Sequence, residues 1–202
     1  LTSLVGWSNI SNELFIRSLR YIIFLKKDFS NLNYNFLDVG TGAGIPSIPI
    51  KIFYPEIHLS LCEPSQKKCS FLEEVINKLN LRNVNIENER AENLGQSCKR
   101  ESYDFVLTRA LAKLPTLAEL TLPLVRVGGK VITAKGKLPN VEIDESKYIS
   151  ELLGSKKTLV EKVIIPNSLP TDHFIIWEKH KSTPVNFPRR NGIPKKRPIL
   201  SD

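Results

Sequence analysis

The chain has 202 residues, of which 41% are hydrophobic and 25% are charged. This length suits one domain that buries roughly 70% of its unfolded surface, and it is too short for two sizeable cores. The composition excludes a disordered or fibrous chain. Because no apolar run reaches the ~18 residues of a membrane span, we expect a soluble, cytoplasmic protein. The sequence begins at Leu1 and contains no Met, so we expect its natural start to be missing.

The net charge is +8, from 29 Lys and Arg against 21 Asp and Glu. A basic excess of this size indicates an acidic partner such as nucleic acid. Most of the excess lies near the C-terminus, because seven basic residues and one acidic residue between Lys179 and Asp202 give this tail a net charge of +6. The alternative is a solvated tail that only increases solubility.

Neither a metal site nor a disulfide framework is indicated by the sequence. The three cysteines form no C-x-x-C pair, and the three histidines have no ligand spacing. We therefore expect reduced thiols and no metal ion.

Strands and helices are expected to alternate along the chain. A covering helix is predicted over 12–27, where apolar residues recur at helical spacing. Buried strands are predicted over 36–39, 57–62, 84–86, 103–107 and 130–134. Helices are predicted between them, over 46–53, 66–79 and 114–125. This alternation predicts a doubly wound, mostly parallel α/β sheet with helices on both faces.

The alternation of strands and helices ends in the last third of the chain. After a predicted helix over 141–153, the strands predicted over 158–165 and 174–177 are too close for a helical crossover, so they should pair as an antiparallel hairpin at one sheet edge. Beyond Lys181, four prolines exclude a stable helix and favour an extended arm. We expect a single domain over 1–182, with 1–30 as its helical cover, and a basic, proline-rich RNA-binding arm over 183–202.

A glycine-rich loop follows the first predicted strand. Residues 37–44 read LDVGTGAG, which places Gly40, Gly42 and Gly44 where the strand turns into a helix. Glycines at this place let a ligand approach the backbone at the carboxyl edge of the sheet. A dinucleotide fingerprint is G-x-G-x-x-G, but Ile45 occupies the place of its third glycine. The loop therefore fits a nucleoside without a pyrophosphate, such as S-adenosylmethionine, better than NAD.

Polar residues end the neighbouring strands. Glu63 ends the second strand, where a carboxylate can accept hydrogen bonds from both ribose hydroxyls. Asp38 ends the first strand, close enough to orient the glycine loop or to hold the amino group of a methionine moiety. Arg90, Ala91 and Glu92 follow the third strand, where backbone amides can read an adenine edge. Taken singly, each is an ordinary polar group of a loop; together they outline one crevice.

Six stretches carry a more specific resemblance: FLDVGTGAGIPSIPI, EPSQKKCSFLEE, RAENL, YDFVLTRALAKL, PLVRVGGKVITAKG and FPRRNGIPKKRPIL, from about residue 36 to 200. With them the sequence resembles the bacterial 16S ribosomal RNA guanine-N7 methyltransferases, a family formerly named for glucose-inhibited division protein B. Many methyltransferases share the glycine loop and the strand-end acid. The Arg109-Ala110 segment and the FPRR-G-P-KK-P tail are much narrower signals.

The resemblance implies a class I S-adenosylmethionine-dependent methyltransferase fold, which is a Rossmann-like, seven-stranded, mostly parallel sheet with an antiparallel terminal hairpin. It implies methylation of guanine N7 in the 16S ribosomal RNA of the small ribosomal subunit. We expect no membrane partner and a monomer. The resemblance also implies cofactor contacts at Gly40, Ile45, Ala91, Glu92 and Arg109, with Glu63 as the ribose-binding acid.

The expected reaction requires little from the protein beyond orientation. Guanine N7 carries an in-plane lone pair and no hydrogen, so direct in-line transfer needs no general base. Arg109, at the carboxyl end of the fourth strand, is the expected catalytic residue, placed between cofactor and guanine to stack on the base or to bind a phosphate. The alternative is a salt bridge from Arg109 to Glu92 or Glu63.

Basic residues are expected to bind the RNA backbone. Arg17 and Lys113 are weaker members of this surface. Its main members are predicted to be Lys135, Arg189, Arg190, Lys195, Lys196 and Arg197.

Near its start the sequence departs from the family pattern. The family has an Arg-His pair, followed three residues after the His by Asp, whereas here Arg17-Ser18 is followed by Tyr21. Two other functions remain open. A small-molecule methyltransferase with the same cofactor is disfavoured by the basic tail, and a non-catalytic RNA-binding or assembly factor is disfavoured by the glycine loop and Glu63.

Overall fold

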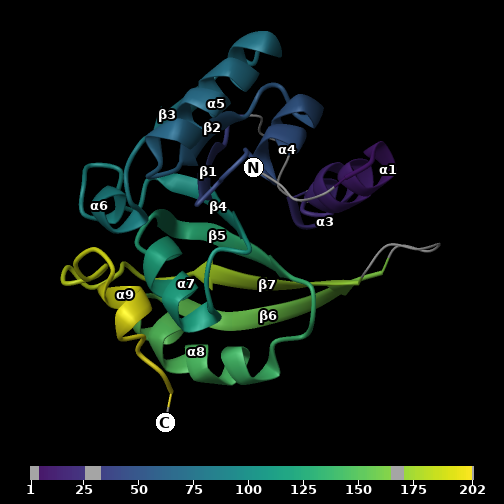
Figure 1. Cartoon of the computed structure of the whole chain (residues 1–202). Coiled ribbons are helices and arrows are strands. Elements are labelled where there is room, and N and C mark those ends of the chain that lie inside the picture. Colours follow the sequence, from purple (N-terminus) through teal and green to yellow (C-terminus); the bar gives the residue numbers. More distant parts are fainter. Residues whose placement is uncertain (1–4, 26–32, 165–170, 202) are drawn as a thin grey trace.

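The computed structural model describes residues 5–25, 33–164 and 171–201. Seven strands within these ranges form one sheet in the order β3-β2-β1-β4-β5-β7-β6 (Figure 1). Strands β1 to β5 pair in parallel, whereas β7 is antiparallel to both β5 and β6. This arrangement confirms the predicted mostly parallel sheet with a terminal hairpin. The strands are β1 (Asn35–Val39), β2 (His58–Cys62), β3 (Val84–Glu87), β4 (Tyr103–Arg109), β5 (Val125–Lys135), β6 (Ser155–Val163) and β7 (Asp172–Lys179).

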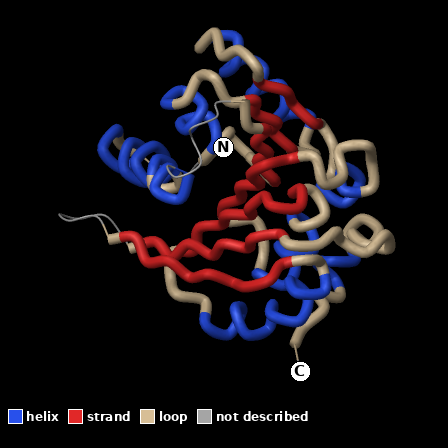
Figure 2. The backbone as a smooth tube through the Cα atoms, turned by 180° about the vertical axis from the view of Figure 1, so that it is seen from behind, coloured by secondary structure: helices blue, strands red, loops and turns tan. Residues whose placement is uncertain are grey.

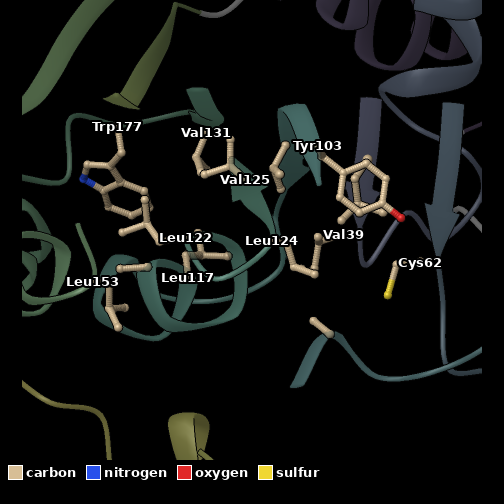
Figure 3. Close-up of a cluster of buried hydrophobic side chains, with 14 of the residues drawn as sticks. Val39, Cys62, Tyr103, Leu117, Leu122, Leu124, Val125, Val131, Leu153 and Trp177 are labelled. Carbon is tan, nitrogen blue, oxygen red and sulfur yellow. The ribbon is translucent and has the colours of Figure 1, made fainter. Parts of the chain in front are cut away.

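Helices cover both faces of the sheet (Figure 2). Because successive strand residues point to opposite faces, Phe36 and Leu37 of β1 belong to different buried clusters. One cluster joins the sheet to the N-terminal helices, α4 (Ser47–Phe53) and α5 (Gln66–Lys78). The other joins it to α6 (Ala91–Gly95), α7 (Leu114–Thr121) and α8 (Asn140–Leu152). Figure 3 shows this second cluster, which extends from Trp177 of β7 to Cys62 of β2.

The N-terminal cover begins earlier than predicted. It comprises α1 (Trp7–Ile10), η1 (Ser11–Ile16), α2 (Arg17–Leu19) and α3 (Ile22–Leu25), while residues 26 and 27 of the predicted helix lie outside the described ranges. Tyr21 hydrogen-bonds this cover to the sheet. Its hydroxyl donates to the Thr108 carbonyl at 2.7 Å and accepts from the Ala134 N–H at 3.2 Å. The tyrosine that stands where the family pattern has Asp therefore joins the cover to β4 and β5.

We expect Tyr21→Phe to lower the free energy of unfolding by about 2 kcal/mol, because it leaves two buried main-chain groups without their partner. Tyr21 is fully buried. Urea denaturation measures the change, with Tyr148→Phe as the control because Tyr148 is 55% exposed. Equal midpoints for Tyr21→Phe and the wild type would contradict this role of the hydroxyl.

One predicted boundary is wrong. The helix predicted over 114–125 ends at Thr121, and β5 already begins at Val125 rather than after the Gly128-Gly129 pair. The strand includes both glycines, but its pairing with β4 is irregular there, because Tyr103 pairs with Val125 and Phe105 already pairs with Lys130. A Cβ on Gly129 would lie only 2.6 Å from the Asp104 carbonyl oxygen. The glycine pair therefore forms an irregular step inside β5, with Gly128 at a φ of 83° and Gly129 close to β4.

Residues 183–201, which we call the C-terminal segment, pack back beside α6 and α7. Arg100 donates to the carbonyl oxygens of Thr183 and Pro184 at 2.7 and 3.0 Å. The segment includes the short helix α9 (Ile193–Lys196). The prediction that prolines exclude a helix there is wrong, because Pro194 lies in the first turn, where an N–H would have no intrahelical partner. No helix in the described ranges combines the length and apolar character needed to cross a membrane.

Candidate functional site

The glycine loop lies at the carboxyl ends of β1 and β2. Gly40, Gly42 and Gly44 have φ angles of 69°, 60° and 84°, which L side chains rarely adopt. The Gly40 N–H donates to the Cys62 carbonyl at 2.9 Å, so the loop is tied to β2. A Cβ on Gly40 would clash with Leu111 at 2.5 Å, whereas one on Gly42 would meet only a carbonyl oxygen at 4.0 Å. The middle glycine is therefore the open one, where a ligand can approach the backbone.

Glu63 is held against this loop. Its Oε2 accepts from the Gly42 N–H at 3.1 Å, and its Oε1 accepts from the Ser65 N–H at 3.0 Å. Lys68 lies 3.5 Å from the carboxylate. The Glu63 residue is only 3% exposed, so its orientation is fixed by main-chain donors on both oxygens.

Asp38 lies beneath the same loop and is fully buried. Its Oδ2 accepts from the Thr41 hydroxyl at 2.7 Å, while Oδ1 makes no hydrogen bond of normal length among the described residues, although the hydroxyl and main-chain N–H of Ser47 are near enough to lower the pKa of the carboxyl. Burial raises the pKa of the Asp38 carboxyl to about 6. A buried acceptor without a partner is rare in a folded protein, and a ligand that donates to it would satisfy it.

A pocket of about 180 Å³ opens beside the loop. It brings together Gly40, Ala91 and Glu92 of the predicted cofactor residues, although Ala91 and Glu92 start helix α6 rather than a loop. Ile45 follows the glycine loop, just before α4, and does not belong to the lining. The lining also does not include Asp38, Gly42, Gly44 or Glu63. The full lining is Val39, Gly40, Cys62, Pro64, Arg90, Ala91, Glu92, Leu111, Ala112, Thr116, Leu120, Gly192 and Lys195.

Arg109 ends β4 but does not line this pocket. Its Nη2 donates to the Glu13 carbonyl at 2.7 Å, so the guanidinium contacts the N-terminal cover. Burial lowers the pKa of this guanidinium. The alternative of an ion pair with Glu92 or Glu63 is not realised, since those carboxylates accept from Gly192 and from the glycine loop instead.

The predicted RNA-binding residues divide into two groups. Three are engaged by carboxylates: Arg17 by Asp172, Lys135 by Glu142 at 2.8 Å, and Arg189 by Glu119 at 2.6 Å. The partners of Arg17 and Arg189 lie 155 and 70 positions away, where no local pattern reveals them, whereas Glu142 lies on the helix that follows Lys135. The others are exposed, and they are Lys113, Arg190, Lys195, Lys196 and Arg197.

No three His, Cys, Asp or Glu side chains of the described residues gather in a way that could hold a metal ion. The site does bring together the pocket beside the glycine loop, the buried carboxylates of Asp38 and Glu63, and the exposed cation of Lys195.

Sequence comparisons find relatives over nearly the whole chain. The GidB family, described as rRNA small subunit methyltransferase G, matches residues 1–168. "Ribosomal RNA small subunit methyltransferase G" of Carboxydothermus hydrogenoformans is 38% identical over 200 residues, which is 98% of this chain and 83% of that protein. The protein of the same name from Bacillus cytotoxicus is 42% identical over 173 residues, 85% of this chain and 72% of its own length.

Solved structures share the fold at low identity. A putative S-adenosyl-L-methionine-dependent methyltransferase from Methanococcus maripaludis has a TM-score of 0.63 at 15% identity, covering 86% of this chain and 90% of its own. TYW2 of M. jannaschii, solved in complex with AdoMet, has a TM-score of 0.59 at 17% identity, covering 82% and 76%. These likenesses confirm the class I methyltransferase fold.

Proposed function

The chain belongs to the rRNA small subunit methyltransferase G family, and we propose that it methylates N7 of a guanine in 16S ribosomal RNA. As a member of this family it is a methyltransferase, and S-adenosylmethionine is its methyl donor. The observation that carries the proposal is the pocket beside the glycine loop, whose wall includes Lys195 of the basic C-terminal segment. A nucleoside site and a polyanion-binding surface are thereby contiguous.

The residues around the loop fit the cofactor. The pocket walls at Ala91 and Glu92 would hold the adenine end, and the carboxylate of Glu63 would accept from the ribose hydroxyls. Each Glu63 oxygen already accepts one main-chain N–H, and a carboxylate has about four acceptor sites, so capacity for the hydroxyls remains. The unpaired Oδ1 of Asp38 would accept from the cofactor's amino group.

Orientation is the main task left to the protein. The cofactor supplies an electrophilic methyl group on its sulfonium. Guanine N7 presents an in-plane lone pair and no proton, so no side chain has to act as a base. Holding two reactants in line can contribute about 7 to 11 kcal/mol to the lowering of a barrier. Arg109, whose guanidinium contacts the Glu13 carbonyl, would stack on the target base or bind its phosphate.

The exposed cations of the C-terminal segment would bind the RNA backbone. We expect the triple variant Arg190→Ala, Lys196→Ala and Arg197→Ala to weaken RNA binding and to reduce the slope of log affinity against log salt by roughly 2 to 3, because each lost phosphate contact removes nearly one unit. Filter binding over a salt series measures both. The control replaces three exposed lysines of β6, namely Lys156, Lys157 and Lys162. Equal slopes for the two triple variants would contradict the assignment.

A transfer assay tests the proposal. Labelled methyl from S-adenosylmethionine should enter 16S ribosomal RNA when unmodified small subunits, or their naked RNA, are supplied, and large-subunit RNA should stay unlabelled. Absence of transfer to either, with cofactor binding confirmed separately, would refute the proposed substrate.

A further inference from the structure

The C-terminal segment reaches the cofactor pocket. Gly192 and Lys195 both line it, together with Gly40 and Ala91, which lie roughly a hundred residues or more away in sequence. The Gly192 N–H donates to Glu92 Oε1 at 2.9 Å, and Glu92 is only 6% exposed. A carboxylate of the pocket therefore has a main-chain partner from the segment that carries the basic residues.

A buried ion pair holds the segment in this place. Glu119 of α7 is 1% exposed, and its carboxylate accepts from the Arg189 main-chain N–H at 2.8 Å as well as from the guanidinium Nε at 2.9 Å and Nη2 at 2.6 Å. The Thr116 hydroxyl donates to the Pro194 carbonyl at 3.2 Å. These contacts fix the chain on both sides of Gly192 against one face of α7. Charge-assisted, bidentate pairs of this kind are geometrically specific.

We infer that Gly192 and Lys195 form one wall of the S-adenosylmethionine site, and that Arg189 and Glu119 are positioning residues which hold this wall. This inference rests on the proposed function, which places the cofactor in this pocket. Arg189 then supports the cofactor site and does not bind RNA phosphates. Its neighbour Arg190 is exposed and remains a phosphate ligand.

Lys195 of this wall lies between the cofactor pocket and a second hollow. This hollow shares Leu111, Ala112 and Thr116 with the cofactor pocket and is additionally lined by Lys113 and Glu145. RNA bound at the exposed cations of the segment therefore acts on the same short stretch that lines the cofactor pocket. Because coupling between two ligands is reciprocal, the factor by which bound RNA changes the affinity for the cofactor equals the factor by which bound cofactor changes the affinity for RNA.

Calorimetric titration with S-adenosylhomocysteine, without RNA, tests the wall. Removing Arg189 alone would leave the Glu119 charge buried without a partner, so the decisive variant carries both Glu119→Leu and Arg189→Leu, since an apolar replacement of a buried ion pair is often tolerated. We expect its affinity to fall at least about 10-fold, as for the loss of one charge-assisted contact. The matched control replaces an ion pair far from the pocket, Asp104→Leu together with Arg126→Leu, and should leave this affinity within about twofold.

A measurement on the wild type is independent of any variant's folding. Saturating S-adenosylhomocysteine should slow hydrogen exchange of the main-chain amides in residues 189–197. Unchanged exchange there, or a folded double variant with wild-type affinity, would overturn the wall while leaving the proposed function intact. A different pattern would refute the proposed function alone. In it, the double variant loses affinity and exchange in the wild type slows as expected, but the wild type transfers no methyl to ribosomal RNA.

Discussion

Arg109→Ala is expected to lower kcat for methyl transfer by about 100-fold, the loss that a small misplacement of a reacting group can cause. The guanidinium lies at the end of β4, outside the pocket beside the glycine loop, and contacts the Glu13 carbonyl. We therefore expect the affinity for S-adenosylhomocysteine to change little. Single-turnover transfer and calorimetry separate the two effects.

The control for this prediction is Arg126→Ala. Arg126 is an exposed arginine that pairs with Asp104 at 2.7 Å, and it lies at the start of β5, at the end of the sheet opposite the glycine loop. Its loss should leave kcat unchanged. An Arg109→Ala variant with wild-type kcat would contradict the positioning role of Arg109.

Asp38→Asn is expected to make the fold more stable at neutral pH and the cofactor site much weaker. Burial raises the pKa of the Asp38 carboxyl from 3.8 to about 6. A shift of that size corresponds to about 3 kcal/mol that ionisation costs the folded state. Asn cannot ionise, and its oxygen can still accept from the Thr41 hydroxyl. The loss of the negative charge should weaken binding of S-adenosylhomocysteine by about 10-fold or more, because a hydrogen bond to a charged group is lost.

The stability of the wild type should fall as the pH rises through the pKa of Asp38. The folded protein holds the Asp38 proton more tightly than the unfolded chain does, so the wild type loses stability as pH rises from about 4 to about 6. The advantage of Asp38→Asn should therefore be largest at pH 7 and disappear near pH 4. Urea denaturation at both pH values measures this difference in stability. The control is Asp104→Asn, near the start of β4 and away from the glycine loop. A variant that is less stable than the wild type at pH 7, or that binds the cofactor equally well, would contradict this account of Asp38.

The sheet and the glycine loop were predictable because their signals are local. Each buried strand is a short apolar run, and Gly40, Gly42 and Gly44 adopt the positive φ angles that only a glycine-rich turn accommodates readily. The family assignment made from short motifs is likewise confirmed by relatives over nearly the whole chain. The five-residue helix α6 was not foreseen, since a helix that short has little periodicity.

The surroundings of the site depend on contacts between distant residues, which no local pattern reveals. Arg189 and Glu119 are 70 positions apart, and Gly192 and Glu92 are 100 apart. From charge alone, Arg189 is indistinguishable from Arg190, yet one is bound to a buried carboxylate and the other is exposed. The same holds for Arg109, whose partner is a main-chain carbonyl of the N-terminal cover and not an acidic side chain.

The most direct test of the central claim is the identity of the methylated atom. After transfer from S-adenosylmethionine to unmodified small subunits, the 16S ribosomal RNA should be treated with the chemistry that cleaves chains at N7-methylguanine. We predict cleavage at a single guanine, absent without enzyme and nearly absent with Arg109→Ala. Methyl incorporation without any such cleavage would place the group on another atom and contradict the proposed reaction.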